Sequence, residues 1–567
     1  MKRCGVILLL AIVCCGGTLA AYRLLAADQP SLARYAPPGA LLYLEAKDFS
    51  RLLSDWSVSP EKAHWVESAN YEAFSRSRLF YRLKQASGEF TSAAGLAPDM
   101  RFVSQVAGSQ SALALYDIGK LQFLYITKLD ASKAEQSALL QSRAKFQTRS
   151  ATGVTFYYRQ NPQSGREVAF ATANGYLLLA TREDLMAGSL ELLAGGKGAS
   201  IEQEPWWTRS VTTAGQPGDL RMVLNLEKIV PSPYFRSYWI QQNITDMKAY
   251  SAAISDLYLS RAQYREQRVL LKKASNAGST PTDTATQGAA DLARLVPANA
   301  GAYQIRSGPS ADACLAVLET KLLAPHSGLG VVSTIAPQVV ISGGEAGGAG
   351  DMETRIDQAP PKMPSQAAQP DSLKALLTGN PVQASLSVQR TSLGPERVFV
   401  RFHTAIVLLG SSDWNEPAAL AAIADFASPM LTASSLGVNW RSNSGVDELD
   451  GLWQLSAAAR GKYLFISDDP ELLRELLPRL EQKVTPSPAT FLAAFNHAGE
   501  RGQFVSLTRL LGDQNVRWIK NAGRLPSFLA GNVGSLSSVL SRASSEEIVV
   551  RDSGDKVLQT VTYEWAN

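Results

Sequence analysis

The chain has 567 residues, more than one hydrophobic core usually organises, so we expect two large domains. Hydrophobic residues make up 45% of the sequence and charged residues 19%, a balance that is typical of a folded protein and favours export over a highly charged cytosolic chain. The net charge of +4 at pH 7 is too small to indicate a nucleic-acid partner.

The N-terminus predicts export. Lys2 and Arg3 precede an uncharged run from Cys4 to Tyr22, and a basic stretch before an apolar one is typical of a secretion signal. Thr18 and Ala20 fit a cleavage site, yet the run is also nearly long enough to span a bilayer. Residues 1–27 are therefore expected to be a signal peptide or a membrane anchor, and the protein periplasmic, extracellular or anchored in the inner membrane.

Removal of that segment would lower the net charge from +4 to +1, because it holds three basic and no acidic residues. It would also leave Cys314 as the last cysteine, so no intramolecular disulfide can form. We expect Cys314 to be an ordinary small buried residue.

In chain order, residues 40–46 predict a buried strand, and short helices follow from Asp48 to about Gly108. Residues 111–118 and 120–127 predict a hairpin that turns at Gly119, and a helix is expected near 132–143. Three closely spaced strands follow, at 153–159, 166–172 and 175–181. Links this short indicate antiparallel pairing.

The helix after residue 181 has a predicted capping box, with Thr181 as the N-cap and Asp184 three positions later. The corresponding helix of the second half has Asp468 or Asp469 as its expected cap. Pro470 fits its first turn, where a missing N–H does no harm.

Later segments of the two halves also correspond. Residues 205–229 and 488–511 each predict a short aromatic helix, a glycine-bearing turn and a strand. A long helical segment is then expected in each half. Its apolar face is formed in the first half by Ile240, Ile244, Met247, Ile254 and Leu257, and in the second by Leu529, Val533, Leu536 and Leu540. Strands end both halves, at 267–273 and 546–565, the latter with a hairpin turn at 552–555.

These correspondences indicate two degenerate copies of one domain. Residues 33–49 match 293–307, residues 175–185 match 461–472, and the matches keep their order. The expected organisation is a first domain at 28–271, a linker at 272–290, and a second domain at 291–567 with a Gly/Pro-rich excursion at 342–371. The predicted fold class is α+β, with two similar domains, each a meandering antiparallel β-sheet with helices packed on one face.

The duplicated pattern behind an N-terminal hydrophobic segment resembles uncharacterised bacterial exported proteins that are grouped only as a domain of unknown function. Its residues are Pro37, Tyr43, Gly175, Tyr176, Leu177 and Leu226 in the first half, and Pro297, Tyr303, Tyr463, Leu464 and Leu507 in the second. The resemblance implies no activity.

No motif indicates catalysis or a cofactor. His64, His326, His403 and His497 stand far apart without metal-ligand spacing, and the GxSxG nucleophile motif is absent. A Ser/His/Asp assembly remains open because such triads form in space rather than along the chain. The acidic clusters are explained by turns, caps and a solvated strand edge. No catalytic, metal or cofactor-binding residue is therefore assigned.

Aromatic side chains are the candidate partner-binding residues, because exposed rings stack on sugars and anchor protein partners. They are Trp206, Trp207, Tyr234, Phe235, Arg236, Tyr238 and Trp239. The alternative is that the rings close a helical layer over the sheet, which Trp518 at the matching place of the second copy favours.

Three functions stay open. The first is a noncatalytic exported envelope protein that binds or scaffolds a partner, such as an envelope protein or an apolar or glycan ligand. The alternative is a periplasmic carrier of a lipid or other apolar ligand, and the third is a hydrolase whose site the sequence does not reveal. No nucleic-acid partner is expected.

Overall fold

The computed structural model describes residues 30–59, 62–63, 66, 71, 74–233, 247–276, 283–323, 371–393, 400–431, 439–451, 453–502 and 543–565. The expected export segment and residues 342–370 lie outside the described residues. No described helix is both long and apolar enough to cross a membrane. The chain divides into two compact units: the first combines Met1–Ser57 with Tyr81–Thr245, and the second combines Val58–Phe80 with Asp246–Asn567. The domain bounds predicted above stay a prediction.

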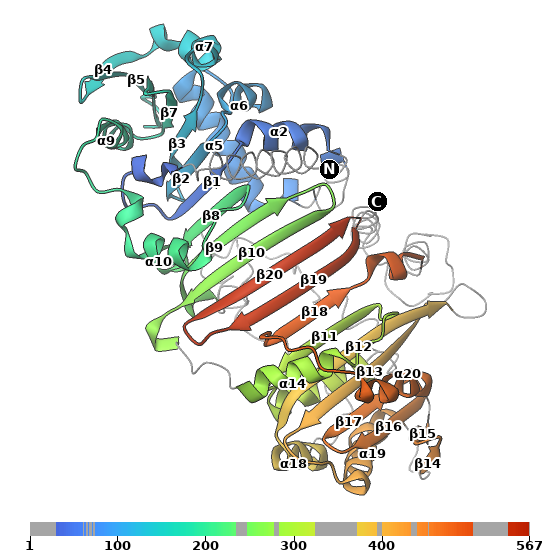
Figure 1. The fold of residues 1–567 in the computed structure, drawn as a ribbon. Helices are drawn as coiled ribbons and strands as arrows, with labels where there is room; N and C mark the ends of the chain where they lie inside the picture. Colours follow the sequence, from blue (N-terminus) through green and yellow to red (C-terminus); the bar gives the residue numbers. More distant parts are fainter. Residues whose placement is uncertain are drawn as a thin grey trace, which may run out of the picture. The chain divides into compact units, whose positions relative to one another are not determined.

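The first unit is built on an antiparallel sheet (Figure 1). Its strands are β1 (Leu42–Ala46), β2 (Ser111–Asp117), β3 (Gln122–Lys128), β4 (Gln147–Ala151), β5 (Val154–Gln160), β6 (Glu167–Ala173), β7 (Tyr176–Ala180) and β8 (Leu220–Asn225). Their spatial order is β8-β1-β2-β3-β7-β6-β5-β4. The predicted hairpin is β2–β3, and the three predicted strands after it are β5, β6 and β7.

Helices cover both faces of this sheet, which corrects the expected single helical face. The helices are η1 (Leu32–Tyr35), α2 (Phe49–Val58), α5 (Arg78–Ala94), α6 (Met100–Val106), α7 (Ala131–Gln136), α8 (Ala138–Gln141), η2 (Arg143–Lys145), α9 (Glu183–Leu193), η3 (Ile201–Gln203), α10 (Pro205–Ala214) and α11 (Leu226–Ile229). Helices α5, α6 and α8 pack with Leu177 and Leu179 of β7. Helix α9 also contacts β7, and the alternate residues Leu178 and Ala180 are fully buried. Successive side chains of a strand point to opposite faces, so a run of buried neighbours requires cover on both.

The second unit holds a longer antiparallel sheet. Its strands are β9 (Tyr250–Leu259), β10 (Gln263–Lys272), β11 (Ala302–Ser307), β12 (Val382–Leu393), β13 (Val400–Gly410), β14 (Trp440–Asn443), β15 (Val446–Asp450), β16 (Gln454–Arg460), β17 (Tyr463–Ser467), β18 (Phe491–Phe495), β19 (Ala543–Asp552) and β20 (Lys556–Trp565). Their order is β9-β10-β20-β19-β18-β11-β12-β13-β17-β16-β15-β14. Together the antiparallel strands of both units and their helices make the fold α+β, as predicted.

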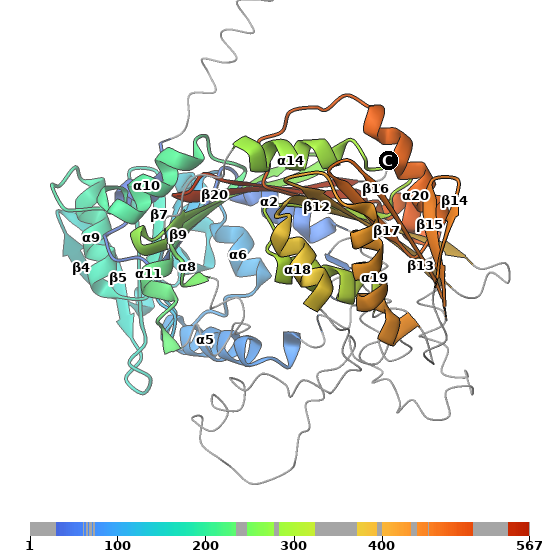
Figure 2. The same ribbon diagram turned by 90° about the horizontal axis from the view of Figure 1, so that it is seen from below.

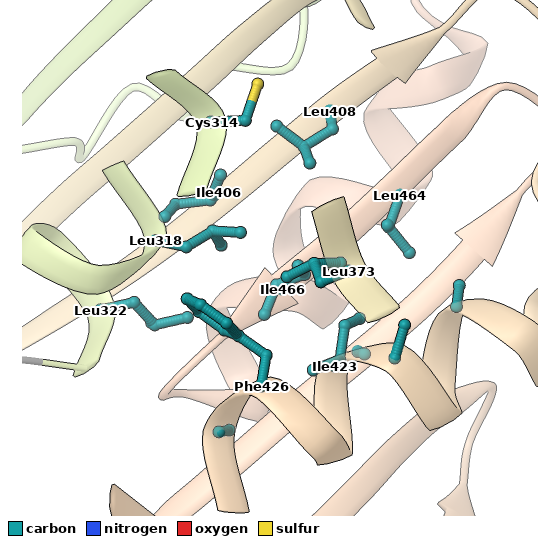
Figure 3. Packing of buried hydrophobic residues seen from close by; sticks show 14 of the residues in the cluster. Cys314, Leu318, Leu322, Leu373, Ile406, Leu408, Ile423, Phe426, Leu464 and Ile466 are labelled. Atoms are coloured by element: carbon teal, nitrogen blue, oxygen red, sulfur yellow. The ribbon is translucent and has the colours of Figure 1, made fainter. Parts of the chain in front are cut away.

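Both faces of the second sheet are covered as well. The helices are η4 (Ala274–Asn276), α14 (Asp283–Ala293), α15 (Ala311–Val317), the π-helix η5 (Leu318–Leu323), α18 (Asp371–Gly379), α19 (Glu416–Leu431), α20 (Pro470–Leu476) and η7 (Leu477–Glu481). Helices α14 and α20 pack on Val407 of β13, whereas α15, η5, α18 and α19 pack on its neighbours Ile406 and Leu408. Figure 2 shows α14 on one side of the sheet and α18 and α19 on the other. Figure 3 shows the cluster around Ile406 and Leu408, which includes Cys314; this side chain is only 1% exposed, as expected for a small buried residue.

The two units share one strand order. Strands β18-β11-β12-β13-β17-β16-β15-β14 repeat the order β8-β1-β2-β3-β7-β6-β5-β4, strand for strand along the chain. In each unit the strand that comes first along the chain lies between the second and the eighth strands. Neither sheet order is therefore the plain meander that was expected.

The hairpins β9–β10 and β19–β20 correspond residue by residue, since all four strands are ten residues long and their bounds keep a constant spacing. Strands β10 and β20 pair with each other, with Gln263 opposite Glu564 and Leu271 opposite Lys556. In the correspondence between the two hairpins, Gln263 of β10 matches Lys556 of β20, and Leu271 matches Glu564. Exchanging each residue for its match therefore turns the first of these pairs into the second. A local pseudo-twofold axis therefore passes through the pair Gln267–Thr560.

Three predicted elements are wrong in type. Residues 491–495, expected in a helix, form β18, and β18 rather than residues 503–511 is the counterpart of β8. Ile254 and Leu257, assigned to a helical face, lie in β9. Residues 283–290 of the expected linker belong to α14, because Ala289 and Leu292 are buried against the sheet.

The caps differ between the copies. The expected Thr181 cap is wrong, because its hydroxyl accepts a hydrogen bond from Phe123 N on β3 instead, at 2.8 Å. The first turn of α9 is capped from another strand, where Glu167 Oε2 accepts from Glu183 N at 2.9 Å. In the second copy Asp469 accepts from Glu471 N at 3.0 Å, and Pro470 occupies the first turn, as predicted.

Candidate functional site

A pocket lies on one face of the second unit's sheet, across β12, β11, β18 and β19. Its volume is about 230 Å³. The strand register arranges its floor as two rows of four side chains, Ser387–Gln304–Ala493–Ile548 and Gln389–Ala302–Phe495–Glu546. Next to these positions along the strands, Ile305, Val388 and Leu492 point to the opposite face and pack in the core. The alternation of a strand therefore separates a buried core face from the pocket face.

Two alanines make the hollow. Ala302 and Ala493 are neighbouring small side chains in a grid whose other members are larger. In the first unit the matching positions are Leu42 and Met222, which have longer side chains. The pocket is thus a property of the second copy's sequence rather than of the shared strand order.

Lys321 lies at the polar side of this hollow, which we call the Lys321 pocket. It belongs to the π-helix η5, whose Leu318 and Leu322 are buried in the core beside α18 and α19. Its Nζ donates to Gln304 Oε1 at 3.0 Å and to Ser387 Oγ at 3.2 Å. Burial, and to a lesser extent the charge of Arg306, lowers the pKa of Lys321. A π-helical turn therefore holds a partly desolvated ammonium group over the sheet.

No ion pair within 4.0 Å joins Lys321 to any carboxylate of the described residues. Arg306, which lies beside it on β11, is exposed and has its guanidinium 5.7 Å from the centroid of the Phe491 ring. It likewise makes no ion pair within the described part of the chain. This side of the pocket therefore carries positive charge that no carboxylate of the described residues pairs with.

Glu546 forms the opposite wall. His497 Nε2 lies 3.7 Å from Glu546 Oε2, beyond hydrogen-bond distance. Burial lowers the pKa of His497, so the imidazole is neutral at pH 7 and does not neutralise the carboxylate. Burial together with the Glu546 charge raises the pKa of Tyr563 to about 12, so this phenol stays protonated as well.

The equivalent face of the first unit is apolar. Its two rows are Leu113–Leu44–Met222 and Leu115–Leu42–Leu224, and all six side chains are half-buried. We call these six residues the apolar face. The same strand order thus presents hydrogen-bonding groups in one copy and hydrocarbon in the other.

The aromatic residues singled out from the sequence are only partly described. Trp207 is 4% exposed and packs edge-on against Tyr43, with ring centroids 4.8 Å apart, so it belongs to the core of the first unit. Trp206 is half-buried, 6.0 Å from Trp207, and its Nε1 has no hydrogen-bond partner among the described residues. Tyr234, Phe235, Arg236, Tyr238 and Trp239 lie outside the described residues, as does Trp518, and their binding role stays a prediction.

Ser392, His403 and Asp469 meet on the other face of the second unit. Ser392 Oγ lies 2.8 Å from His403 Nε2, and His403 Nδ1 lies 3.3 Å from Asp469 Oδ2. This is the order of nucleophile, base and orienting carboxylate in serine hydrolases. The contacts also have a structural role, because Arg390 of β12 pairs with Asp469 at 2.9 Å and Asp469 caps α20. Ser392 itself lies in the regular ladder of β12 rather than on a turn that exposes it.

We expect Ser392→Ala to leave ester hydrolysis unchanged at the background rate. It should lower the free energy of unfolding by about 0.5–1.5 kcal/mol, as for one lost hydrogen bond. Turnover of p-nitrophenyl acetate and urea unfolding measure the two quantities, with Ser545→Ala on β19 as the control. Hydrolysis by the parent protein that Ser392→Ala abolishes would establish the catalytic interpretation instead.

No metal site is evident, since no group of three or more His, Cys, Asp or Glu residues in the described part of the chain is arranged to hold an ion. Sequence reasoning missed Lys321 because neither its spacing nor its neighbours along the chain set it apart. The available signal was the interruption of an apolar strand pattern by Gln304, Ser387 and Gln389.

Comparisons with known proteins give partial structural likeness only. No family model and no curated protein matches the chain. Three crystal forms of a protein named TP0453, forms I, IV and III, are 10%, 13% and 12% identical to it and cover 44%, 43% and 44% of this chain. The matches span 81%, 82% and 82% of those chains, with TM-scores of 0.22, 0.24 and 0.23. Likeness at this level carries no inference about function.

Proposed function

We propose that the protein is a noncatalytic exported envelope protein whose second unit binds its partner or ligand in the Lys321 pocket. The observation that carries the proposal is the Lys321 ammonium group, held at 3.0 Å from Gln304 and 3.2 Å from Ser387 in a hollow of about 230 Å³, without a carboxylate partner among the described residues. Binding sites typically combine apolar surface with a few placed polar groups, and Phe495 and Ile548 supply the apolar part here.

Export and duplication support the same function. The basic start followed by an uncharged run at 4–22 is typical of a secretion signal, so the pocket would face the periplasm or the exterior. The strand order common to both units supports a duplicated scaffold. The pocket arises where the copies differ, at Ala302 and Ala493, and differences between copies are where a duplicated scaffold acquires separate roles.

A carrier of a lipid or other apolar ligand is the second candidate, and the apolar face of the first unit favours it. Six half-buried aliphatic side chains in two rows form a continuous hydrocarbon surface. Soluble proteins seldom leave such a surface without an interaction to cover it. In the second copy Ser387 and Gln389 stand where the first has Leu113 and Leu115.

One experiment tests both candidates: native mass spectrometry of the protein extracted from its own envelope. Ala493→Met places the first copy's residue in the pocket, and we expect it to remove any bound small molecule. Gln559→Met, on the same sheet face but outside the pocket, should retain the bound molecule. An adduct that survives Ala493→Met, or a parent protein that carries none, would contradict binding in the Lys321 pocket.

A separate double substitution tests the carrier hypothesis. The pair Leu113→Ser and Leu115→Gln gives the first unit the polar groups of the second. A bound lipid that this pair removes, and that Ala493→Met leaves in place, would support the carrier over pocket binding.

A further inference from the structure

The charged groups of the Lys321 pocket are arranged unevenly. Lys321 and Arg306 lie on the side of β11 and β12, and neither has an ion-pair partner among the described residues. A partly buried cation is stable only when hydrogen bonds or a counter-ion replace its lost water. The two hydrogen bonds of Lys321 replace part of its lost water, but both acceptors are neutral, so they supply no negative charge to balance the ammonium group.

The neighbours of Lys321 are set to donate. Gln304 accepts from Lys321 through its side-chain carbonyl oxygen, so its amide N–H groups can still donate. Ser387 accepts from Lys321 through its hydroxyl oxygen, so its hydroxyl proton can still be donated. An ammonium also carries a third N–H beyond the two in use. Lys321, Gln304 and Ser387 thus each keep a donor on the cationic side of the hollow, and an oxyanion bound there could accept from them.

The side of the pocket away from Lys321 restricts which further chemical groups the ligand can have. Phe495 and Ile548 offer apolar contact, and the Glu546 carboxylate lies beyond them, next to the neutral His497 imidazole and the protonated Tyr563 phenol. A second negative charge at that end would be repelled. The volume of about 230 Å³ far exceeds the roughly 10–15 Å³ that one water needs, so a small organic molecule fits.

The geometry points to a small ligand with one anionic group, a carboxylate or a phosphate, that docks on Lys321, Gln304 and Ser387 and extends an apolar body over Ala493 toward Phe495. The inference deepens the proposed function and rests on it. It assigns the chemical class of the ligand, which neither the pocket's shape nor its location settles.

A charge series of similar shape tests this inference. Benzoate, neutral benzamide and cationic benzamidine are titrated into the full protein, with binding followed by ligand-observed NMR, and phenyl phosphate distinguishes a phosphate from a carboxylate ligand. We expect benzoate or phenyl phosphate to bind at least tenfold more tightly than benzamide, and benzamidine most weakly.

Two substitutions assign the effect to the pocket. Lys321→Met keeps the aliphatic stem but removes the charge, and it should weaken the anion by at least tenfold. Lys483→Met makes the same charge change at an exposed lysine elsewhere in the second unit and should have no effect. Glu546→Gln should strengthen anion binding by about two- to fivefold, because it removes a nearby like charge.

The outcomes separate the two proposals. Equal binding of benzoate and benzamide, or benzoate binding that Lys321→Met leaves unchanged, would overturn the anionic assignment. If Ala493→Met still removed the bound molecule from envelope-derived protein in that case, the pocket would stand as the binding site with a different ligand class. If Ala493→Met removed neither benzoate nor that molecule, the proposed function would fail.

Discussion

Replacing Phe465 by alanine is expected to lower the free energy of unfolding of the second unit by about 3–5 kcal/mol. Phe465 is fully buried on β17, in the cluster formed with α14 and α20. Its strand neighbours Val407 on β13 and Ala458 on β16 are smaller side chains fixed in the ladder, so they cannot move in to fill the space. The loss therefore combines the transfer free energy of the ring with the free energy of the cavity left behind.

The matched control is Phe402→Ala on β13, where the side chain is 50% exposed. Removal of an exposed ring should change the free energy of unfolding by no more than about 0.5 kcal/mol. Urea unfolding, with hydrogen exchange of second-unit peptides to identify which unit opens, measures both variants. A loss below about 1 kcal/mol for Phe465→Ala, or equal losses for the two variants, would contradict this account of the core.

Strands were predicted well where side chains alternate or form compact apolar runs. The hairpin at 111–127 and the strand 175–181 appear as β2–β3 and β7, because their patterns distinguish strand from helix without reference to the rest of the chain. The turn at 552–555 is also confirmed, where Asp552 Oδ1 accepts from Gly554 N at 2.9 Å. Local chemistry was sufficient in each of these places.

Elements that depend on distant partners were not predictable. Residues 491–495 are short and apolar, and they form a strand because β11 and β19 flank them, which no local pattern reveals. Thr181 has the sequence of a helix cap, yet a hydrogen bond to β3 takes its hydroxyl. The linker expected at 272–290 contains enough alanine and glycine to appear unstructured, although small residues let α14 approach β12, where a Cβ on Gly288 would lie 3.3 Å from Ala384 Cβ.

The candidate site was missed for the same physical reason. Lys321, Ser387 and Ala493 are far apart along the chain, and only the pairing of β12, β11 and β18 brings them to one face. The sequence directed attention to aromatic residues instead, of which Trp207 is a core residue beside Tyr43. Comparing the copies strand by strand finds the site, because it shows Ala302 and Ala493 where the first copy has Leu42 and Met222.

Proline at the centre of the β10–β20 ladder is the second substitution with a large expected effect. Thr560 lies in β20, which has β10 on one side and β19 on the other. Its backbone N–H therefore donates to a carbonyl of one of these two strands. Thr560→Pro removes that donor and fixes φ near −65°, and we expect a loss of about 2–4 kcal/mol in the free energy of unfolding. Thr560→Ala keeps the backbone donor, and its loss should stay within about 1 kcal/mol.

The pseudo-twofold axis makes this expectation more specific. Gln267 is the counterpart of Thr560 and lies between β20 and β9, the counterparts of β10 and β19. Gln267→Pro should therefore destabilise the second unit as much as Thr560→Pro, and each should expose the amides of both β10 and β20 to hydrogen exchange. Urea unfolding and exchange at residues 263–272 and 556–565 provide the measurement. If Thr560→Ala proved as damaging as Thr560→Pro, side-chain packing rather than the ladder would join the strands; if Gln267→Pro and Thr560→Pro differed widely, the two hairpins would not be energetic equivalents.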